Sequence, residues 1–243
     1  MKFLCVSDQI DPLVYSSNAK ERFKDVDAVL CAGDLPLDYV DFIVSTLNKP
    51  TFFIFGNHNL NEFHLYHGRS ADILVPNLPT RKNIAQTVFK SFGHGADYVG
   101  FKMLRVKEIP VTVAKTNKKT PLLMAGVSGS IRYNNGMNQY TEFQMLLKLL
   151  KLIPGMIINK ILYGRYVDIF LTHAPPRHIH DLEDDCHKGF KCYNWFIKKF
   201  SPQFMVHGHI HLYDSRAERE TLCGRTNIVN AFGCIIIEMP ENI

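Results

Sequence analysis

The sequence predicts a layered α/β fold. Short apolar segments of β-type composition recur along the chain, with turn signals and helical stretches between them. Most of these segments are unbroken runs of apolar residues, which is typical of strands in a sheet that is covered on both faces. Hydrophobic residues make up 46% and charged residues 21% of the 243 residues, which is ordinary globular usage. We therefore expect one α/β domain over residues 1–243.

The expected elements alternate along most of the chain. Strands are predicted for the apolar runs at 2–7, 28–32, 51–55, 122–126, 168–172, 203–206 and 227–238. Helices are predicted at 17–24, 38–48, 139–153 and 193–200. Residues 60–120 fit this alternation poorly, because proline and glycine interrupt them often. We interpret them as a loop-rich excursion that contains a hairpin within residues 100–113.

The charge and composition of the chain limit which partners and which cellular compartment we expect. The net charge of +5 is compatible with a phosphate-bearing substrate, but the basic residues form no stripe of the kind that nucleic-acid binding needs. The first residues, "MKFLCVSD", are apolar for too short a stretch to resemble a secretory signal, and no segment predicts a transmembrane helix. We expect a cytoplasmic protein whose six cysteines are free thiols.

Candidate ligands follow the predicted strands. Residues 206–213 read "VHGHIHLY", and on a single strand His207, His209 and His211 would share one face. In open α/β sheets, ligands gather at the carboxyl ends of the strands. Five predicted strands are followed by such residues, and these are Asp8, Asp34, Asn57 with His58, His173, and His209 with His211. Carboxylate, carboxamide and imidazole without thiolate suit Mn²⁺, Fe, Zn²⁺ or Ni²⁺, and one carboxylate can bridge two such ions.

In this order, Asp8, "GD", "GNH", "TH" and "GHIH" resemble the motifs of the calcineurin-like metallophosphoesterases over nearly the whole chain. The resemblance implies a four-layer β-sandwich of two mixed sheets flanked by helices. It also implies two divalent metal ions and hydrolysis of a phosphoester by a metal-activated hydroxide. Asp34 would bridge the ions, and His58 with Asn57 would be catalytic. The implied ligands are Asp8, Asp34 and His211 for the first site, and Asp34, Asn57, His173 and His209 for the second, whereas His207 lies outside the pattern and is expected to be structural.

Two residues depart from the family pattern. The family places a histidine two residues after the first aspartate, and this chain has Ile10 there, which cannot bind a metal. The first site is therefore expected to be weak or empty. The family also has an acid after the "GNH" motif, where this chain has Asn59. A carboxylate would favour the charged form of a neighbouring histidine, so His58 is expected to be protonated less often than in the family.

Residues 143–163, "FQMLLKLLKLIPGMIINKILY", are apolar with a few lysines. They predict either a long helix packed on the flank of the sheet and broken near Pro154, or an exposed face. An exposed face could form a lid, a homo-oligomer contact or a membrane-surface contact.

Three functions are compatible with these residues. The first is a metal-dependent phosphohydrolase for phosphodiesters or small phosphoesters. The second is a catalytically degenerate scaffold of the same fold that binds a protein partner, for which Ile10 and Asn59 are the support. The third is a nuclease, which the lack of a basic stripe disfavours.

Overall fold

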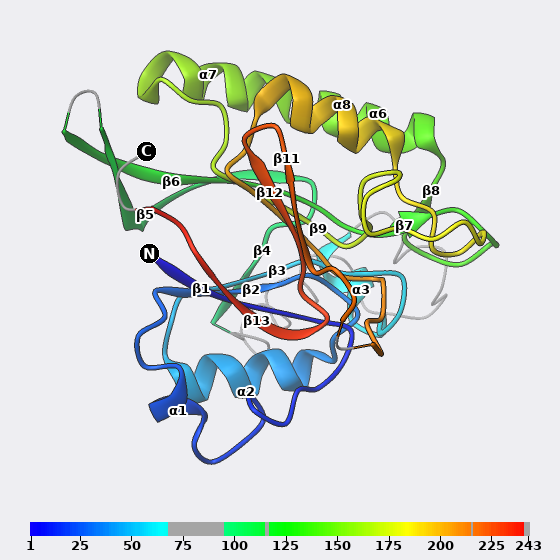
Figure 1. Ribbon diagram of the computed structural model, residues 1–243, viewed down its shortest axis with the longest axis horizontal. Coiled ribbons are helices and arrows are strands. Elements are labelled where there is room, and N and C mark those ends of the chain that lie inside the picture. Colours follow the sequence, from blue (N-terminus) through cyan, green and yellow to red (C-terminus); the bar gives the residue numbers. More distant parts are fainter. Residues whose placement is uncertain (68–94, 115–116, 215, 241–243) are drawn as a thin grey trace, which may run out of the picture.

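The computed structural model describes residues 1–67, 95–114, 117–214 and 216–240. Two mixed β-sheets lie face to face, and helices cover the outer face of each (Figure 1). This arrangement confirms the predicted sandwich of two mixed sheets flanked by helices. Part of the predicted excursion, residues 68–94 and 115–116, lies outside the described residues.

The smaller sheet has the strand order β13-β1-β2-β3-β4. Strands β1 to β4 are parallel, and β13 pairs with β1 in the antiparallel sense. The first four strands are β1 (Lys2–Ser7), β2 (Ala28–Cys31), β3 (Thr51–Phe53) and β4 (Ala96–Tyr98), and the fifth is β13 (Gly233–Glu238). The carboxyl ends of β1, β2 and β3 therefore lie at one edge of the sheet.

The larger sheet has the order β11-β12-β10-β9-β6-β5. Its strands β12, β10, β9 and β6 are parallel, and the two edge strands are antiparallel to their neighbours. They are β5 (Lys102–Val113), β6 (Lys118–Val127), β9 (Ile169–Thr172), β10 (Phe204–His207), β11 (Glu220–Cys223) and β12 (Thr226–Asn230). Strands β7 (Ser130–Ile131) and β8 (Gln139–Tyr140) form a separate parallel pair.

Helices form the two outer layers. The smaller sheet carries α1 (Ala19–Arg22) and α2 (Leu37–Leu47), and α3 (Phe63–Tyr66) follows β3. The larger sheet carries α6 (Glu142–Leu150), α7 (Ile153–Tyr163) and α8 (Lys191–Phe200) (Figure 1). A capping box between Thr141 and Gln144 begins α6, and Gly164 in the left-handed conformation ends α7.

Alternating strand residues build three apolar clusters. In β9, Ile169 and Leu171 face the other sheet, whereas Phe170 between them faces the outer helices. The central cluster joins residues of both sheets, such as Phe3 with Met124. The strands were predictable as unbroken apolar runs because both faces of each sheet are covered.

Three sequence predictions need correction. Residues 227–238, predicted as one strand, form β12 and β13 in different sheets, because the chain turns before Gly233, which has a φ of +68°. Residues 139–153, predicted as a helix, begin as β8, and the helix starts only after Thr141. Residues 100–113 do not fold back on themselves, because β5 is one arm of a hairpin whose other arm is β6.

In the described part of the chain, no helix is both long enough and apolar enough to cross a membrane. All six cysteines are free thiols.

Candidate metal centre

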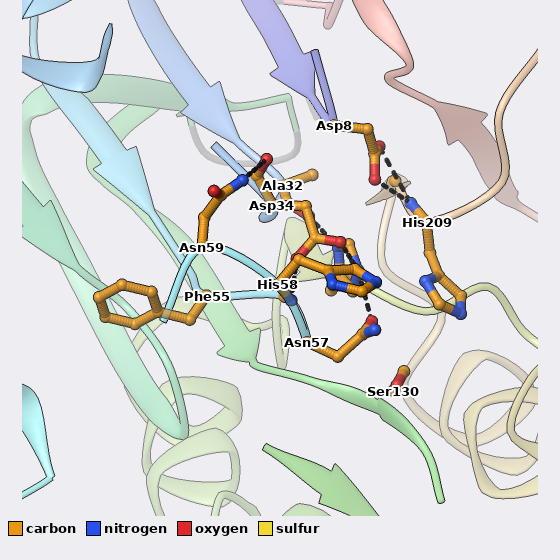
Figure 2. Close-up of polar contacts among 12 residues, drawn as sticks. Asp8, Ala32, Asp34, Phe55, Asn57, His58, Asn59, Ser130 and His209 are labelled. Carbon is orange, nitrogen blue, oxygen red and sulfur yellow. Dashed lines mark hydrogen bonds and ion pairs between the residues drawn. The ribbon is translucent and has the colours of Figure 1, made fainter. Parts of the chain in front are cut away.

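The residues predicted as ligands come from both sheets and gather where the strands end. Figure 2 shows Asp8, Asp34, Asn57, His58 and His209 around one region. Asp8, Asp34 and Asn57 follow β1, β2 and β3 of the smaller sheet, and His173 and His209 follow β9 and β10 of the larger sheet. One atom each of Asp34, His173 and His209 lies within 4.8 Å of the others, and all three residues are buried.

His173 is oriented by a backbone contact and points at two oxygens. Its Nδ1 lies 2.9 Å from the carbonyl oxygen of Ala32 and donates a hydrogen bond to it. Its Nε2 lies 3.3 Å from Oδ2 of Asp34 and 3.2 Å from Oδ1 of Asn57. A ring nitrogen that faces two acceptor oxygens needs a cation between them, either a proton or a metal ion.

The charges of His173 and Asp34 depend on one another. Burial alone would lower the pKa of His173, but the Asp34 carboxylate, with Asp8 and the Ala32 carbonyl, raises that pKa to about 9. Burial alone would raise the pKa of Asp34, but the His173 ring, together with His58, lowers it to about 2. Without a metal, the ring therefore carries a proton in the place where an ion would bind.

His209 is buried and neutral. Burial, together with the charge of His173, lowers its pKa to about 3. Its Nε2 donates to the carbonyl oxygen of Cys186 over 2.7 Å, so Nδ1 is the nitrogen with a free lone pair. Its backbone N–H donates to both carboxylate oxygens of Asp8, at 2.9 and 3.0 Å. His209 thus links the ligands of the two expected sites.

The expected first site is less complete. Nε2 of His211 lies 3.9 Å from Oδ1 of Asp8, while its Nδ1 contacts the Tyr213 hydroxyl at 2.8 Å. The His211 ring stacks on Phe232 at 4.9 Å and is partly exposed. Ile10, in the position of the missing histidine, is 47% exposed. This side of the centre therefore has two candidate ligands of its own, in addition to the shared Asp34.

The backbone is strained at three of the candidate ligands. Asp8, Asp34 and His209 all have a positive φ, at 66°, 55° and 70°. Such angles are uncommon in residues other than glycine and tend to mark functional sites. Close packing also requires Gly56, because a Cβ there would meet Asp34 Oδ1 at 2.1 Å and the His173 ring at 2.6 Å.

The three histidines of 206–213 do not share a strand face. β10 ends at His207, and the positive φ of His209 interrupts the alternation. His207 is fully buried, and burial lowers its pKa to about 3. Its Nε2 lies 2.9 Å from Nδ1 of His180, whose Nε2 contacts the Thr221 hydroxyl. His207 therefore packs against other partners and takes no part in the cluster.

The loop after β3 holds the residues expected to meet the substrate. The backbone N–H of His58 donates to Oδ1 of Asp34 over 2.7 Å, and the residue is exposed. Asn59, which replaces the family's acid, donates from its side chain to the backbone oxygen of Asp34. The Asn57 amide nitrogen donates to the Tyr133 hydroxyl over 3.3 Å. Tyr133 had only a weak sequence signal, a glycine- and asparagine-rich turn after a strand.

A second group of possible ligands lies next to His209. Asp184, Cys186 and His187 each place a donor atom within 4.8 Å of the others, and they are partly or fully exposed. The His187 ring lies 5.3 Å from that of His209. The sequence did not predict this proximity, because the loop reads as a solvated acidic segment. This loop contacts the centre through the backbone oxygen of Cys186, which accepts from His209. A backbone contact of this kind cannot be predicted from a pattern of side chains.

The chemistry of the buried donors fits a divalent cation. The Nε2 atom of His173 and the Nδ1 atom of His209 are unprotonated nitrogen donors once the proton of His173 has left. Asp34 supplies a buried carboxylate beside them, and the Asn57 carboxamide oxygen is close to His173. This is an O/N donor set of the kind that binds Mn²⁺, Fe, Zn²⁺ or Ni²⁺.

Removing one nitrogen donor should remove most of the tighter metal binding. We expect His173→Ala and His209→Ala each to weaken Mn²⁺ binding by about tenfold or more in calorimetry, with the fold retained in circular dichroism. His178→Ala is the matched control, since its ring is 67% exposed. Unchanged affinity in both ligand variants would contradict the assignment.

Metal binding should strengthen as the pH rises, because a metal must displace the proton of His173 below pH about 9. We expect affinity to rise about tenfold per pH unit from about pH 6 to about pH 9, with about one proton released per ion. In metal-free protein the same raised pKa should stabilise the fold fully below the ordinary value of 6.5, and this contribution should disappear as the pH rises through about 9. Calorimetry in buffers of different ionisation enthalpy measures the protons released, and binding without proton release at neutral pH would refute the link.

A profile of calcineurin-like phosphoesterases matches residues 1–213. No curated protein is significantly similar in sequence. Similar solved structures include TT1561 of Thermus thermophilus, which is 14% identical with a TM-score of 0.56. The match covers 95% of this chain and 88% of TT1561. Another is GAP50, described as the anchor in the inner membrane complex of Plasmodium, 10% identical with a TM-score of 0.51, covering 95% and 70%. These structures share the fold, and the family profile spans most of the sequence, so the chain belongs to the calcineurin-like phosphoesterase family.

Proposed function

We propose that this protein is a metal-dependent phosphohydrolase for phosphodiesters or small phosphoesters. The observation that carries the proposal is the orientation of His173, whose Nε2 points at oxygens of Asp34 and Asn57 in a buried cluster with His209. A purely structural histidine would have no need of two acceptor oxygens and a strained neighbouring carboxylate. The family supports a phosphoesterase in general, and the buried donors support one that uses metal.

We assign two unequal sites to the centre. Asp34, Asn57, His173 and His209 hold the tighter ion, and Asp8 with His211 and a share of Asp34 holds the weaker one. Divalent ions bound there would acidify a water molecule and neutralise charge on the phosphoryl group. Mn²⁺ is the metal with which to begin, and Fe, Zn²⁺ and Ni²⁺ suit the same donors.

The residues around the centre orient the substrate. The His58 side chain is exposed, and its backbone is fixed by Asp34, so the ring can contact a phosphoryl oxygen or donate a proton to the leaving group. Asn57 uses its oxygen toward His173 and its nitrogen toward Tyr133. Because the Tyr133 oxygen accepts that bond, its own proton is available for a phosphoryl oxygen.

A scaffold that binds a protein partner is the second candidate. It is favoured by Ile10, which is exposed where the family has a ligand, and by Asn59, which bonds the backbone of Asp34. The Plasmodium protein of similar fold is described as an anchor, so the fold alone does not decide between the two functions. The buried donor cluster favours the enzyme, because a scaffold has no physical need for it. A cytoplasmic location stays a prediction, and a homo-oligomer contact and a membrane-surface contact stay alternatives for residues 143–163.

The experiment that separates these functions combines metal analysis with an activity screen. Protein purified without chelator is tested with Mn²⁺ against bis-p-nitrophenyl phosphate and cyclic nucleotides. The proposal predicts bound metal and activity that Asp34→Ala removes. Protein that binds no metal, or that is inactive on every phosphoester at saturating Mn²⁺, would favour the scaffold.

His58→Ala should lower turnover and leave metal content unchanged. We expect a loss of about 10²-fold or more on substrates with poor leaving groups, because such substrates need a proton donor, and a smaller loss on nitrophenyl esters. His64→Ala is the matched control, an exposed histidine on α3. Full activity of His58→Ala on poor leaving groups would refute the role.

Ile10→His should restore the missing ligand of the first site. Because Ile10 is 47% exposed, the substitution removes little packing, so the imidazole can approach Asp8 and His211 at low cost. We expect the wild type to show two unequal Mn²⁺ binding events or only one. The variant should reach half-maximal activity at about tenfold lower Mn²⁺. Ile10→Ala is the control for loss of the isoleucine, and equal, tight binding at both sites of the wild type would contradict the assignment.

A further inference from the structure

Helices α6 and α7 expose an apolar stripe on the outside of the protein. On α6 the exposed apolar residues are Phe143, Leu147 and Leu150, and on α7 they are Ile157, Ile158, Ile161 and Leu162. Phe143 is 66%, Ile161 77% and Leu162 61% exposed. Single exposed apolar residues are ordinary on a protein surface, but seven on two consecutive helices form a patch that calls for an explanation.

The stripe runs along both helices. The two residues between them, Lys151 and Leu152, keep right-handed helical backbone angles, so the helical phase continues through the junction. At about 100° per residue, Phe143, Leu147, Leu150, Ile157 and Ile161 fall within an arc of about 80°. The buried residues of the same helices lie about 180° away, and these are Met145, Leu149, Leu152, Met156 and Asn159. The helices are therefore apolar on the face that packs against the sheet and again on the opposite face.

Positive charges flank the stripe. Residues 142–163 contain three lysines and one acid. Lys151 and Lys160 are exposed, whereas Lys148 is half-buried and packs over the Phe101 and Tyr140 rings. The acid is Glu142, whose carboxylate accepts hydrogen bonds from the backbone at the start of α8 and so is already engaged within the protein. α8 lies in the same outer layer (Figure 1) and adds three exposed lysines and a 39% exposed Trp195, without any acid.

We propose that this outer face of α6 and α7 binds the surface of a membrane that contains anionic lipids. An amphipathic helix with an apolar face and flanking lysines lies in the interface plane, with its apolar side chains below the headgroups and its lysines at the phosphates. An exposed tryptophan beside it suits the same interface. The inference is independent of the proposed hydrolysis, since none of these residues is in the metal centre.

Charge decides between a membrane and a second copy of the chain. In a symmetric dimer the same patch meets itself, so the lysines of α6, α7 and α8 would face or flank lysines with no free acid on these helices to pair them. An anionic membrane surface, in contrast, provides a negative charge for each exposed lysine. This attraction acts over about one Debye length from the surface.

The test is co-sedimentation of the full chain with vesicles of phosphatidylcholine, with and without phosphatidylglycerol. We expect binding to the anionic vesicles that weakens at high salt. Ile161→Ser/Leu162→Ser should reduce partitioning by about tenfold or more. Lys151→Gln/Lys198→Gln should reduce it on anionic vesicles, because both lysines are exposed. Leu222→Ser is the matched control, since Leu222 is a 72% exposed apolar residue on β11.

Two further measurements keep the outcomes distinct. Analytical ultracentrifugation should show a monomer, and a dimer that Ile161→Ser/Leu162→Ser dissociates would overturn the proposal in favour of a second copy. Activity on a small soluble phosphoester should be equal in the variants and the wild type, so that a failure of the membrane proposal is separate from a failure of the proposed function. No binding to either vesicle, or binding that the double variant does not weaken, would also refute the proposal.

Discussion

The contact of His173 with Asp34 is the interaction on which the rest of the centre depends. It joins a side chain that follows β9 of the larger sheet to one that follows β2 of the smaller sheet. Both groups are buried, and the removal of one partner of such a pair typically destabilises a protein by about 3–5 kcal/mol, because the other charge stays buried and unpaired. The contact also explains why glycine stands at positions 33 and 56, where any Cβ would press against the His173 ring. The His173 ring and the Asp34 carboxylate thus link the two sheets and are also the proposed metal ligands.

The difference that we propose between the two metal sites follows from where that contact lies. His173 and His209 are buried with Asp34 in one cluster, whereas His211 and Ile10, near Asp8, are exposed. A buried donor set holds its ligands in place before an ion arrives, which favours tight binding. On the exposed side, the His211 ring stacks on Phe232 and contacts the Tyr213 hydroxyl, and its Nε2 lies 3.9 Å from Asp8. We therefore interpret the centre as one strong site that a second, weaker ion completes.

Residues at strand ends could be predicted from the sequence, and contacts between loops could not. The apolar runs at 28–32 and 168–172 indicated buried strands, and ligands gather at the carboxyl ends of such strands, which is where Asp34 and His173 lie, although their strands belong to different sheets. The split of 227–238 was missed because both halves are equally apolar, and only a turn before Gly233 separates them. The bond from His209 to the Cys186 carbonyl was missed because every residue has such an oxygen. The exposed stripe of α6 and α7 stayed one of two interpretations, since a helix that is apolar on both sides reads the same whether or not it is covered.

Anomalous X-ray diffraction from crystals grown with Mn²⁺ would locate a bound ion without reference to activity. We expect the strongest anomalous peak between Asp34, His173 and His209, with His173 Nε2 as a ligand. A weaker peak, or none, is expected beside Asp8 and His211. A peak confined to Asp184, Cys186 and His187, or no peak in contact with His173, would show that His173 is not a metal ligand.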